Sequence, residues 1–249
     1  MSVEGSQSFS RLHFECVGGA AGDMILGALL DLGADVAAVR RALASMALPG
    51  LELRTERVVV DDIAALYVRS LVDDGAHHRN LGDVLAIIDR GDMNDAARQR
   101  AHGIFEILVA AEAVAHECAA EDVHLHEVGA LDSIMDVVGI AVALGSLGNP
   151  PASASPIPSG HGNVSTAHGL LTCPVPAVAA VAERWHVPLI DVDVQGETVT
   201  PTGIAALANI CSSFGDAPVI DSETDACGVG AGSRRFARAS NLVRVHGIR

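Results

Sequence analysis

The thirteen residues from 124 to 136, His-Leu-His-Glu-Val-Gly-Ala-Leu-Asp-Ser-Ile-Met-Asp, constrain the fold more than any other stretch. They hold two imidazoles and three carboxylates, which are costly to bury together unless they are paired, hydrogen-bonded or bound to a cation. An extended segment turns His124 and His126 to one face, and a helix does the same for Asp132 and Asp136. The stretch therefore predicts a strand edge beside a helix start, with nitrogen and oxygen ligands for a divalent metal. A second interpretation stays open, in which Asp132 caps the helix and the histidines are solvated.

The composition limits what the chain can bind. Its 249 residues suffice for one large domain or two small ones, and 49% are hydrophobic although only 3% are aromatic. The formal net charge of −15 argues against a nucleic-acid partner or an anionic membrane surface and favours the attraction of cations.

Two residue types exclude further classes of chemistry. The chain contains no lysine, so a Schiff base, a pyridoxal-phosphate anchor and a Walker A phosphate loop are excluded. The five cysteines are widely spaced and form neither a disulfide framework nor a zinc-ribbon pattern. The Ser-rich start lacks the apolar core of a signal peptide, and the longest apolar run, 137–147, is too short to span a bilayer. A cytoplasmic protein without a membrane segment is the expectation.

Hydrophobic periodicity predicts a mixed fold. Helices are expected over 24–32, 36–46, 81–89, 95–118, 133–147, 177–184 and 204–214, and strands over 12–17, 51–60, 64–72, 153–157 and 241–246. The strands 51–60 and 64–72 are expected to form a hairpin that turns near Asp61-Asp62. Asp23 is expected to cap the first helix or to place a carboxylate at a pocket mouth, Gly33 to end that helix, and Thr200 or Thr202 to cap the last one. We expect an α/β to α+β fold with mixed sheets, packed helices and two intimately associated subdomains with a pocket between them. Residues 1–11 are expected to be disordered, 12–148 to form the first subdomain and 149–249 the second, after the break at Asn149-Pro150-Pro151.

Two glycine-rich segments are candidates for anion binding. The segment 18–23 links a strand to a helix, where backbone N–H groups can bind a phosphate, although it lacks the dinucleotide-binding GxGxxG pattern. The segment 228–235 is expected to be a glycine-rich turn followed by two guanidinium groups. A turn with solvated arginines remains the alternative for it. The phosphate-binding candidates are Gly19, Gly22, Gly230, Gly232, Arg234 and Arg235.

The polar loop 73–80 contains a pair of adjacent histidines, His77 and His78. The pair is a candidate for metal capture, with simple exposure of two loop histidines as the alternative. A Ser-His-Asp hydrolase is not supported, because the nucleophile pattern GxSxG does not occur.

Taken in order, the motifs resemble those of the LarC family, the nickel-insertion proteins of lactate racemase maturation. The opening 15–24 followed by 27–33, the His-rich loop 77–81 and the segment 124–139 all match family signatures. Three more signatures follow at 167–169, 196–203 and 228–232, so the resemblance covers nearly all of residues 12–245. Ala21 departs from the family pattern, which usually has Ser there.

The resemblance implies insertion of Ni(II) into a pyridinium bis-thiocarboxylate mononucleotide, which yields the nickel-pincer cofactor of a client enzyme such as lactate racemase. Formation of a metal–carbon bond at the ring requires loss of a ring proton, and Glu127 and His126 are the first candidates for the base. The implied metal ligands are His77, His78, His124, His126, Asp132 and Asp136.

Full-length relatives continue into a C-terminal domain that binds cytidine triphosphate with a divalent cation and assembles the oligomer. We therefore expect this chain alone not to bind that nucleotide, and a separate C-terminal partner chain or a homo-oligomer stays open. Two alternatives to an active nickel-insertion cyclometallase are kept: a non-catalytic nickel-binding chaperone half, and a divalent-metal hydrolase of a small phosphorylated substrate.

Overall fold

Seven strands form a mixed sheet in the part of the chain that the structure describes. The structure is a computed structural model, and it describes residues 9–70, 79–123, 125, 130–166, 169–219, 221 and 224–249. The order across this main sheet is β2-β3-β10-β11-β1-β4-β9, and two smaller sheets pair β5 with β8 and β6 with β7. The strands are β1 (Arg11–Cys16), β2 (Leu53–Val60), β3 (Ile63–Ser70), β4 (Ala152–Ala154), β5 (Ile157–His161), β6 (Asn163–Thr166), β7 (Gly169–Thr172), β8 (Leu189–Gln195), β9 (Cys211–Phe214), β10 (Ala226–Ala231) and β11 (Leu242–Ile248). The mixed α/β class expected from the sequence is confirmed.

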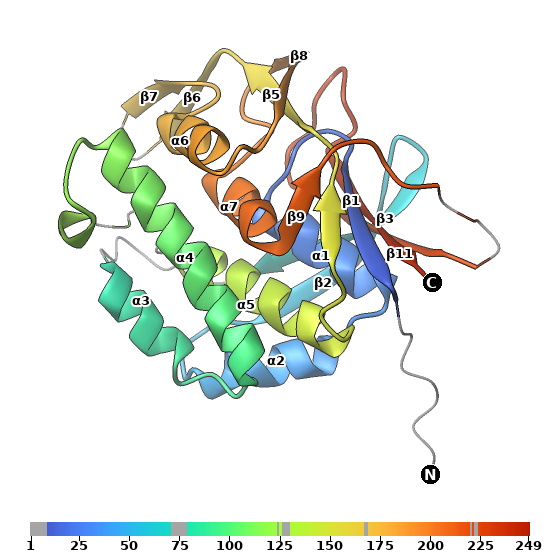
Figure 1. The fold of residues 1–249 in the computed structure, drawn as a ribbon, viewed down its shortest axis with the longest axis horizontal. Helices are drawn as coiled ribbons and strands as arrows, with labels where there is room; N and C mark the ends of the chain where they lie inside the picture. Colours follow the sequence, from blue (N-terminus) through green and yellow to red (C-terminus); the bar gives the residue numbers. More distant parts are fainter. Residues whose placement is uncertain are drawn as a thin grey trace.

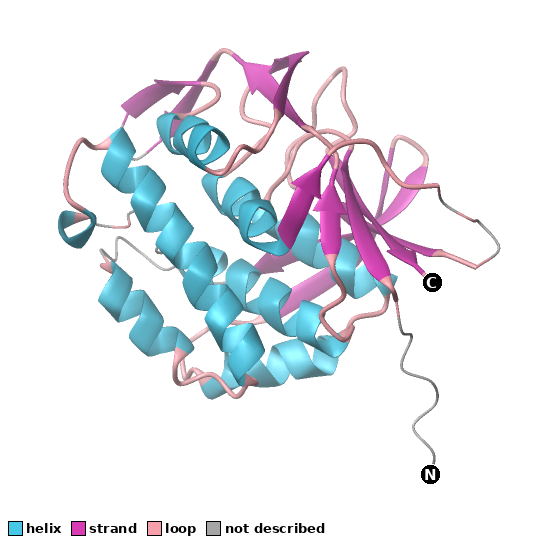
Figure 2. Cartoon of the chain, in the orientation of Figure 1, coloured by secondary structure: helices cyan, strands magenta, loops and turns pink. Residues whose placement is uncertain are grey.

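The helices gather on one side of the main sheet (Figure 2). They are α1 (Gly22–Leu32), α2 (Val36–Ser45), α3 (Leu81–Ile88), α4 (Asp95–Ala115), α5 (Leu131–Ser146), α6 (Pro176–Arg184) and α7 (Pro201–Ile210), with a 3-10 turn at Ala120–Asp122. Helix α1 packs on β10, β3 and β11, and α5 lies between α1, α2 and α4 (Figure 1). The apolar run predicted for α5 is buried along most of its length, because neighbouring helices surround it.

The predicted hairpin around Asp61 and Asp62 is confirmed. Strands β2 and β3 pair antiparallel from Leu53 opposite Ser70 to Val60 opposite Ile63. Asp61 and Asp62 both have positive φ values, 50° and 64°. Positive φ at both central residues is typical of the type I′ turn, which is favoured in two-residue hairpins. The short connection therefore sets the register of this edge of the sheet.

The prediction of a glycine-rich turn at 228–232 is wrong over most of its length. Residues 226–231 form β10, a strand inside the main sheet between β3 and β11. A Cβ at Gly230 would overlap the carbonyl oxygen of Met24, and one at Gly228 would overlap that of Ala28. These glycines are therefore explained by the close approach of α1 to the strand.

The helix predicted over 204–214 is also too long. Helix α7 ends at Ile210, and residues 211–214 form strand β9, which pairs parallel with β4. Apolar periodicity alone did not distinguish the helix from the strand that follows it, because a strand of four residues is too short to show a period of its own.

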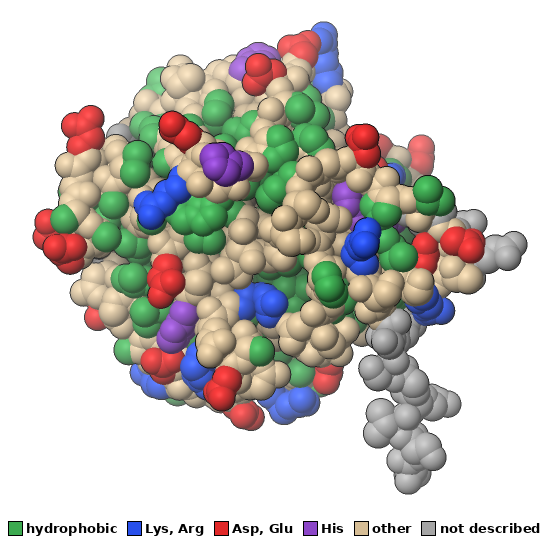
Figure 3. Space-filling model, viewed as in Figure 1, with side chains coloured by type: hydrophobic (Ala, Val, Ile, Leu, Met, Phe, Trp, Pro, Cys, Tyr) green, Lys and Arg blue, Asp and Glu red, His purple; other side chains and the backbone are tan. Residues whose placement is uncertain are grey.

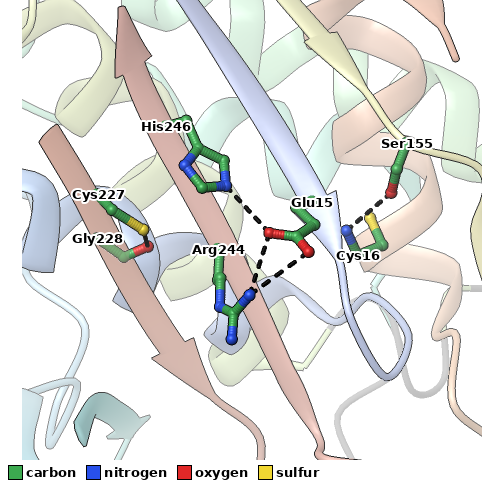
Figure 4. A network of polar contacts seen from close by, with 7 residues as sticks. All are labelled: Glu15, Cys16, Ser155, Cys227, Gly228, Arg244 and His246. Carbon is green, nitrogen blue, oxygen red and sulfur yellow. Dashed lines mark hydrogen bonds and ion pairs between the residues drawn. The ribbon is translucent and has the colours of Figure 1, made fainter. Parts of the chain in front are cut away.

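The face of the main sheet away from α1 carries a polar network (Figure 4). Glu15 on β1 accepts a hydrogen bond from His246 at 3.0 Å and forms an ion pair with Arg244 at 3.4 Å, both from β11. His13, directly opposite His246 in the β1–β11 pair, lies 2.9 Å from Ser153 through its Nδ1 atom. The network joins β11, β1 and β4 across the centre of the sheet.

The main sheet takes β1, β2 and β3 from residues before 149 and its other strands from residues after it. The division at 148/149 stays a prediction. Within the described residues, no helix is long and apolar enough to cross a membrane. Figure 3 shows acidic and arginine side chains scattered over one face of the molecule rather than gathered into a single patch.

Candidate functional site

Four of the described helices begin at one cavity of about 670 Å³. The first residues of α1, α5, α6 and α7 all line it. Strand β3, the β6–β7 hairpin and the segments around Glu197 and Arg234 complete the wall. Helix N-termini carry partial positive charge and free backbone donors, so their convergence favours an anionic ligand.

The caps of these helices differ from those elsewhere in the fold. Away from the cavity, α2, α3 and α4 are capped by Asp35, Asn80 and Asn94, whose side chains each accept a backbone N–H. At the cavity, Ala21, Ala130 and Val175 precede α1, α5 and α6, and none of these apolar residues supplies a side-chain cap. No capping residue satisfies the donors at these helix starts. In the first turns of α1 and α5, Asp23 and Asp132 each accept the N–H of the residue that follows them.

Helix α7 is the exception at the cavity. Thr200 accepts a hydrogen bond from the N–H of Gly203 at 3.1 Å and is followed by Pro201 at the first helical position. The sequence left Thr200 and Thr202 open as the cap, and the structure shows that it is Thr200. Just before α7, Val199 forms an isolated parallel β-bridge with Ala20, which joins the start of α7 to the segment before α1.

Two carboxylates lie deep in the cavity. Asp136 comes from the second turn of α5 and Asp23 from the first turn of α1. The N–H of Met24 donates to Asp23 Oδ1 at 2.8 Å. The Oδ1 atom of Asp136 is buried and has no hydrogen-bond partner among the described residues.

Both carboxyl groups are held in a form that resists ionisation. Burial raises the pKa of Asp136 well above its usual value, and the negative charges of Asp23 and Asp132 raise it further. Burial also raises the pKa of Asp23 to about 6, with Asp132 adding to the rise and Met24 N–H and Arg234 opposing it. Such shifts are typical of functional sites, where a cation or a proton must offset the charge.

Arg234 is fixed at the cavity wall by Glu197. Its guanidinium donates to the Glu197 carbonyl oxygen at 2.9 Å and pairs with the Glu197 carboxylate, also at 2.9 Å. Asn241 donates to the Arg234 carbonyl oxygen at 3.2 Å. These contacts hold the arginine in one orientation at the edge of the site.

The structure brings together only part of the set predicted from the sequence. Gly22, Gly232, Arg234, Asp132 and Asp136 line the cavity. Gly19 and Gly230 do not; both lie where backbone from another segment would overlap a Cβ, Thr198 in the first case and Met24 in the second. Arg235 instead lines a separate hollow of about 250 Å³ with His161 and Arg238.

The remaining predicted residues, His77, His78, His124, His126 and Glu127, lie outside the described residues. Among those that are described, no three His, Cys, Asp or Glu side chains are grouped closely enough to hold a metal ion.

Other residues of the site were not predicted. Asp23 was recognised only as a helix cap or a carboxylate at a pocket mouth, and Glu197 not at all. Glu112 and His116 near the end of α4 also line the cavity. Their i, i+4 spacing was a signal for a shared helix face, but nothing in the sequence tied that face to α1 or α7.

Comparison with known proteins identifies the family. A family model described as nickel insertion protein matches residues 12–247. The chain is 41% identical over 240 residues to the pyridinium-3,5-bisthiocarboxylic acid mononucleotide nickel insertion protein of Acetivibrio thermocellus, covering 93% of this chain and 58% of that protein. It is 38% identical over 234 residues to the protein of the same name from Staphylococcus epidermidis, covering 94% and 58%.

No solved structure matched the chain. The chain spans less than two thirds of the length of the two curated relatives named above. Because the family model matches nearly all of its residues, the chain belongs to the nickel insertion protein family.

Proposed function

We propose that this chain takes part in the insertion of nickel into a pyridinium bis-thiocarboxylate mononucleotide and that the cavity holds this substrate. The relatives' names supply the substrate class. The observation that carries the proposal is the convergence of four helix N-termini on a cavity that also contains buried carboxylates. The cavity therefore offers donors for an anionic ligand and oxygen ligands for its metal.

The volume and charge of the cavity agree with such a ligand. A cavity of about 670 Å³ lies within the range that encloses small organic ligands. A mononucleotide with two thiocarboxylates carries several negative charges, which suit the uncapped start of α6 and the guanidinium of Arg234. Gly22 and Gly232 also line the cavity, where they make room for the side chains of Asp136 and Asn241.

The chemistry divides between holding the metal and removing a proton. Oxygen and imidazole ligands bind Ni(II) less firmly than the sulfurs of the substrate, which favours transfer in one direction. Asp132 and Asp136 are proposed as metal-holding groups together with His77, His78, His124 and His126. The ring proton that leaves as the nickel–carbon bond forms needs a base, for which Glu127 and His126 remain the candidates.

The test is product formation. The purified chain is incubated with Ni(II) and the thiolated mononucleotide, with and without cytidine triphosphate and a divalent cation, and with and without a C-terminal segment of a relative. The absorbance of the nickel–thiolate product and its mass are followed, and phosphate release is measured in parallel. Phosphate release without a nickel-containing product would contradict the proposal and favour the hydrolase alternative.

Substitution of Arg234 tests the assignment of the cavity. Arg234→Ala should raise the concentration of mononucleotide needed for half-maximal insertion about 10- to 100-fold, since a charge-assisted hydrogen bond contributes roughly 1.5–3 kcal/mol. Arg238→Ala is the matched control, because Arg238 is exposed and pairs with Asp193 outside the cavity. Equal effects of the two substitutions would place the substrate elsewhere.

A further inference from the structure

Helix α1 begins directly on Asp136. A Cβ added at Gly22 would lie 2.6 Å from Asp136 Oδ2, so only glycine lets the two helix starts meet this closely. The next residue, Asp23, lines the same cavity as Asp136, and its charge raises the pKa of Asp136. The chain therefore forces two acidic side chains together at the cavity, more than 100 residues apart in sequence.

The hydrogen bonds around this pair leave one oxygen unused. Asp23 accepts the N–H of Met24, so one oxygen of Asp23 is already engaged. The Oδ1 atom of Asp136 is buried at the cavity wall and has no partner among the described residues. A buried, unpartnered carboxylate oxygen next to a second carboxylate is costly unless a cation binds there.

The local charges favour a cation over an anion at this point. Asp132, four residues before Asp136 on the same face of α5, adds a third carboxylate at the cavity. Arg234 also acts on Asp23, but its guanidinium is bound to the Glu197 carboxylate at 2.9 Å. The negative end of the cavity lies at α1 and α5, and the arginine lies at its wall.

We propose that Asp23 and Asp136 form a two-carboxylate seat that holds the nickel ion before its transfer, an inference that rests on the proposed function. The described residues provide no complete three-ligand site, so water and the substrate's sulfurs fill the remaining positions. A site with only a few oxygen ligands suits an ion that must be passed on, because the sulfur donors of the substrate can then take the ion from it. Asp23 is the residue that the sequence did not assign to the metal.

The experiment measures divalent-ion binding by the 249-residue chain without any mononucleotide. Mn²⁺ is the main probe, since carboxylate oxygens suit it whereas imidazoles favour nickel and zinc. Free Mn²⁺ is followed by electron paramagnetic resonance, and the melting temperature is recorded with and without Mn²⁺ and Ni²⁺. The variants are Asp23→Asn, Asp136→Asn and the control Asp216→Asn, which removes an exposed carboxylate outside the cavity.

The parent and the control should bind Mn²⁺ and melt at a higher temperature in its presence. Both cavity variants should lose at least about tenfold in Mn²⁺ affinity, while their metal-free melting temperatures should not fall below that of the parent, because a repelling charge is gone. A purely structural role would instead lower the metal-free melting temperature and leave binding unchanged. Asp23→Asn decides the matter even if Asp136→Asn does not fold, since the amide oxygen can still accept the Met24 N–H.

The proposed two-carboxylate seat is wrong if the parent does not bind Mn²⁺, or if the parent and all variants bind it equally well. Because no substrate is present, this result is independent of the insertion assay. A parent that inserts nickel while Asp23→Asn retains Mn²⁺ affinity refutes only the seat. A parent that binds Mn²⁺ through Asp23 and Asp136 but never forms product refutes only the proposed reaction.

Discussion

Two groups of ionisable side chains lie on opposite sides of the main sheet, and the pKa values of their carboxylates shift in opposite directions. On the side of α1, burial and neighbouring carboxylates raise the pKa values of Asp23 and Asp136. On the far side, burial would raise the pKa of Glu15, but the hydrogen bond from His246 and the charge of Arg244 outweigh it and the pKa is lowered (Figure 4). In the first group Arg234 only partly offsets the rise in the pKa of Asp23, whereas the second group contains the positive partners that outweigh burial.

The difference separates a ligand site from a structural network. Glu15 finds its partners on the adjacent strand β11, where side chains opposite each other in an antiparallel pair are in reach. Asp23 and Asp136 meet only where two helices begin, and one oxygen of the pair remains unpartnered within the described chain. In the network the unpartnered buried atoms are ring nitrogens, Nε2 of His13 and Nδ1 of His246, while the Glu15 carboxylate is paired. At the cavity the unpartnered atom is a carboxylate oxygen, and that kind of atom is the one a cation would complete.

A substitution at Gly230, on strand β10 of the main sheet between the two regions, should give the largest effect on stability. Gly230→Ala would force a Cβ against the Met24 carbonyl oxygen and push α1, with Asp23, away from the sheet. We expect a loss of at least about 3 kcal/mol in the free energy of unfolding, measured by urea denaturation. Gly215→Ala is the control, because nothing lies within 4 Å of a Cβ there. Equal stability of the two variants would show that α1 does not need this close approach.

The pH dependence of stability should distinguish the regions next. The pKa of Asp23 is raised from 3.8 to about 6 in the folded chain, so its contribution is present below pH 3.8 and is lost as the pH rises through 6. In metal-free protein, the parent should lose on the order of 2 kcal/mol over this window once partial exposure is allowed for.

Asp23→Asn should remove most of that loss, with Asp132, Asp136 and Arg234 setting the remainder. Melting temperatures between pH 4 and 7.5, in the presence of a chelator, provide the measurement. An identical pH profile for parent and variant would mean that Asp23 ionises freely.

The polar network on the far side should give the smallest effect, with the opposite sign. Because the pKa of Glu15 is lowered, its contribution is present above its usual value of 4.5 and is lost as the pH falls through the folded value. Glu15→Gln should cost about 1 kcal/mol at pH 7, since the side chain is 36% exposed and solvent screens the pair. Its cost should disappear in acid.

The matched control for Glu15 is Glu52→Gln, which breaks an ion pair with Arg54 that is exposed on both sides. Denaturation at pH 7 and pH 4 compares the two. A Glu15→Gln variant as stable as the parent at pH 7 would remove the distinction between a network whose positive partners outweigh burial and a site where they do not.

Local pattern was sufficient for most of the helices, though not for the end of α7, and for the β2–β3 hairpin. The apolar periodicity of 133–147, the helix stop at Gly33 and the turn at 61–62 each depend on residues close together in sequence, and the structure places all three as predicted. The family resemblance likewise rested on short motifs in order, and the family match confirms it. These features follow from backbone preferences and from which face of an element is apolar.

Tertiary structure decided which residues meet. The glycines of 228–230 looked like a turn, and only the packing of α1 shows that they belong to a strand. Asp23 looked like a helix cap, and only the meeting of α1 with α5 makes it a partner of Asp136. Side-chain pattern specifies how a segment folds, but the charge that a residue experiences depends on segments far away in sequence, because electrostatic and steric contacts act through space.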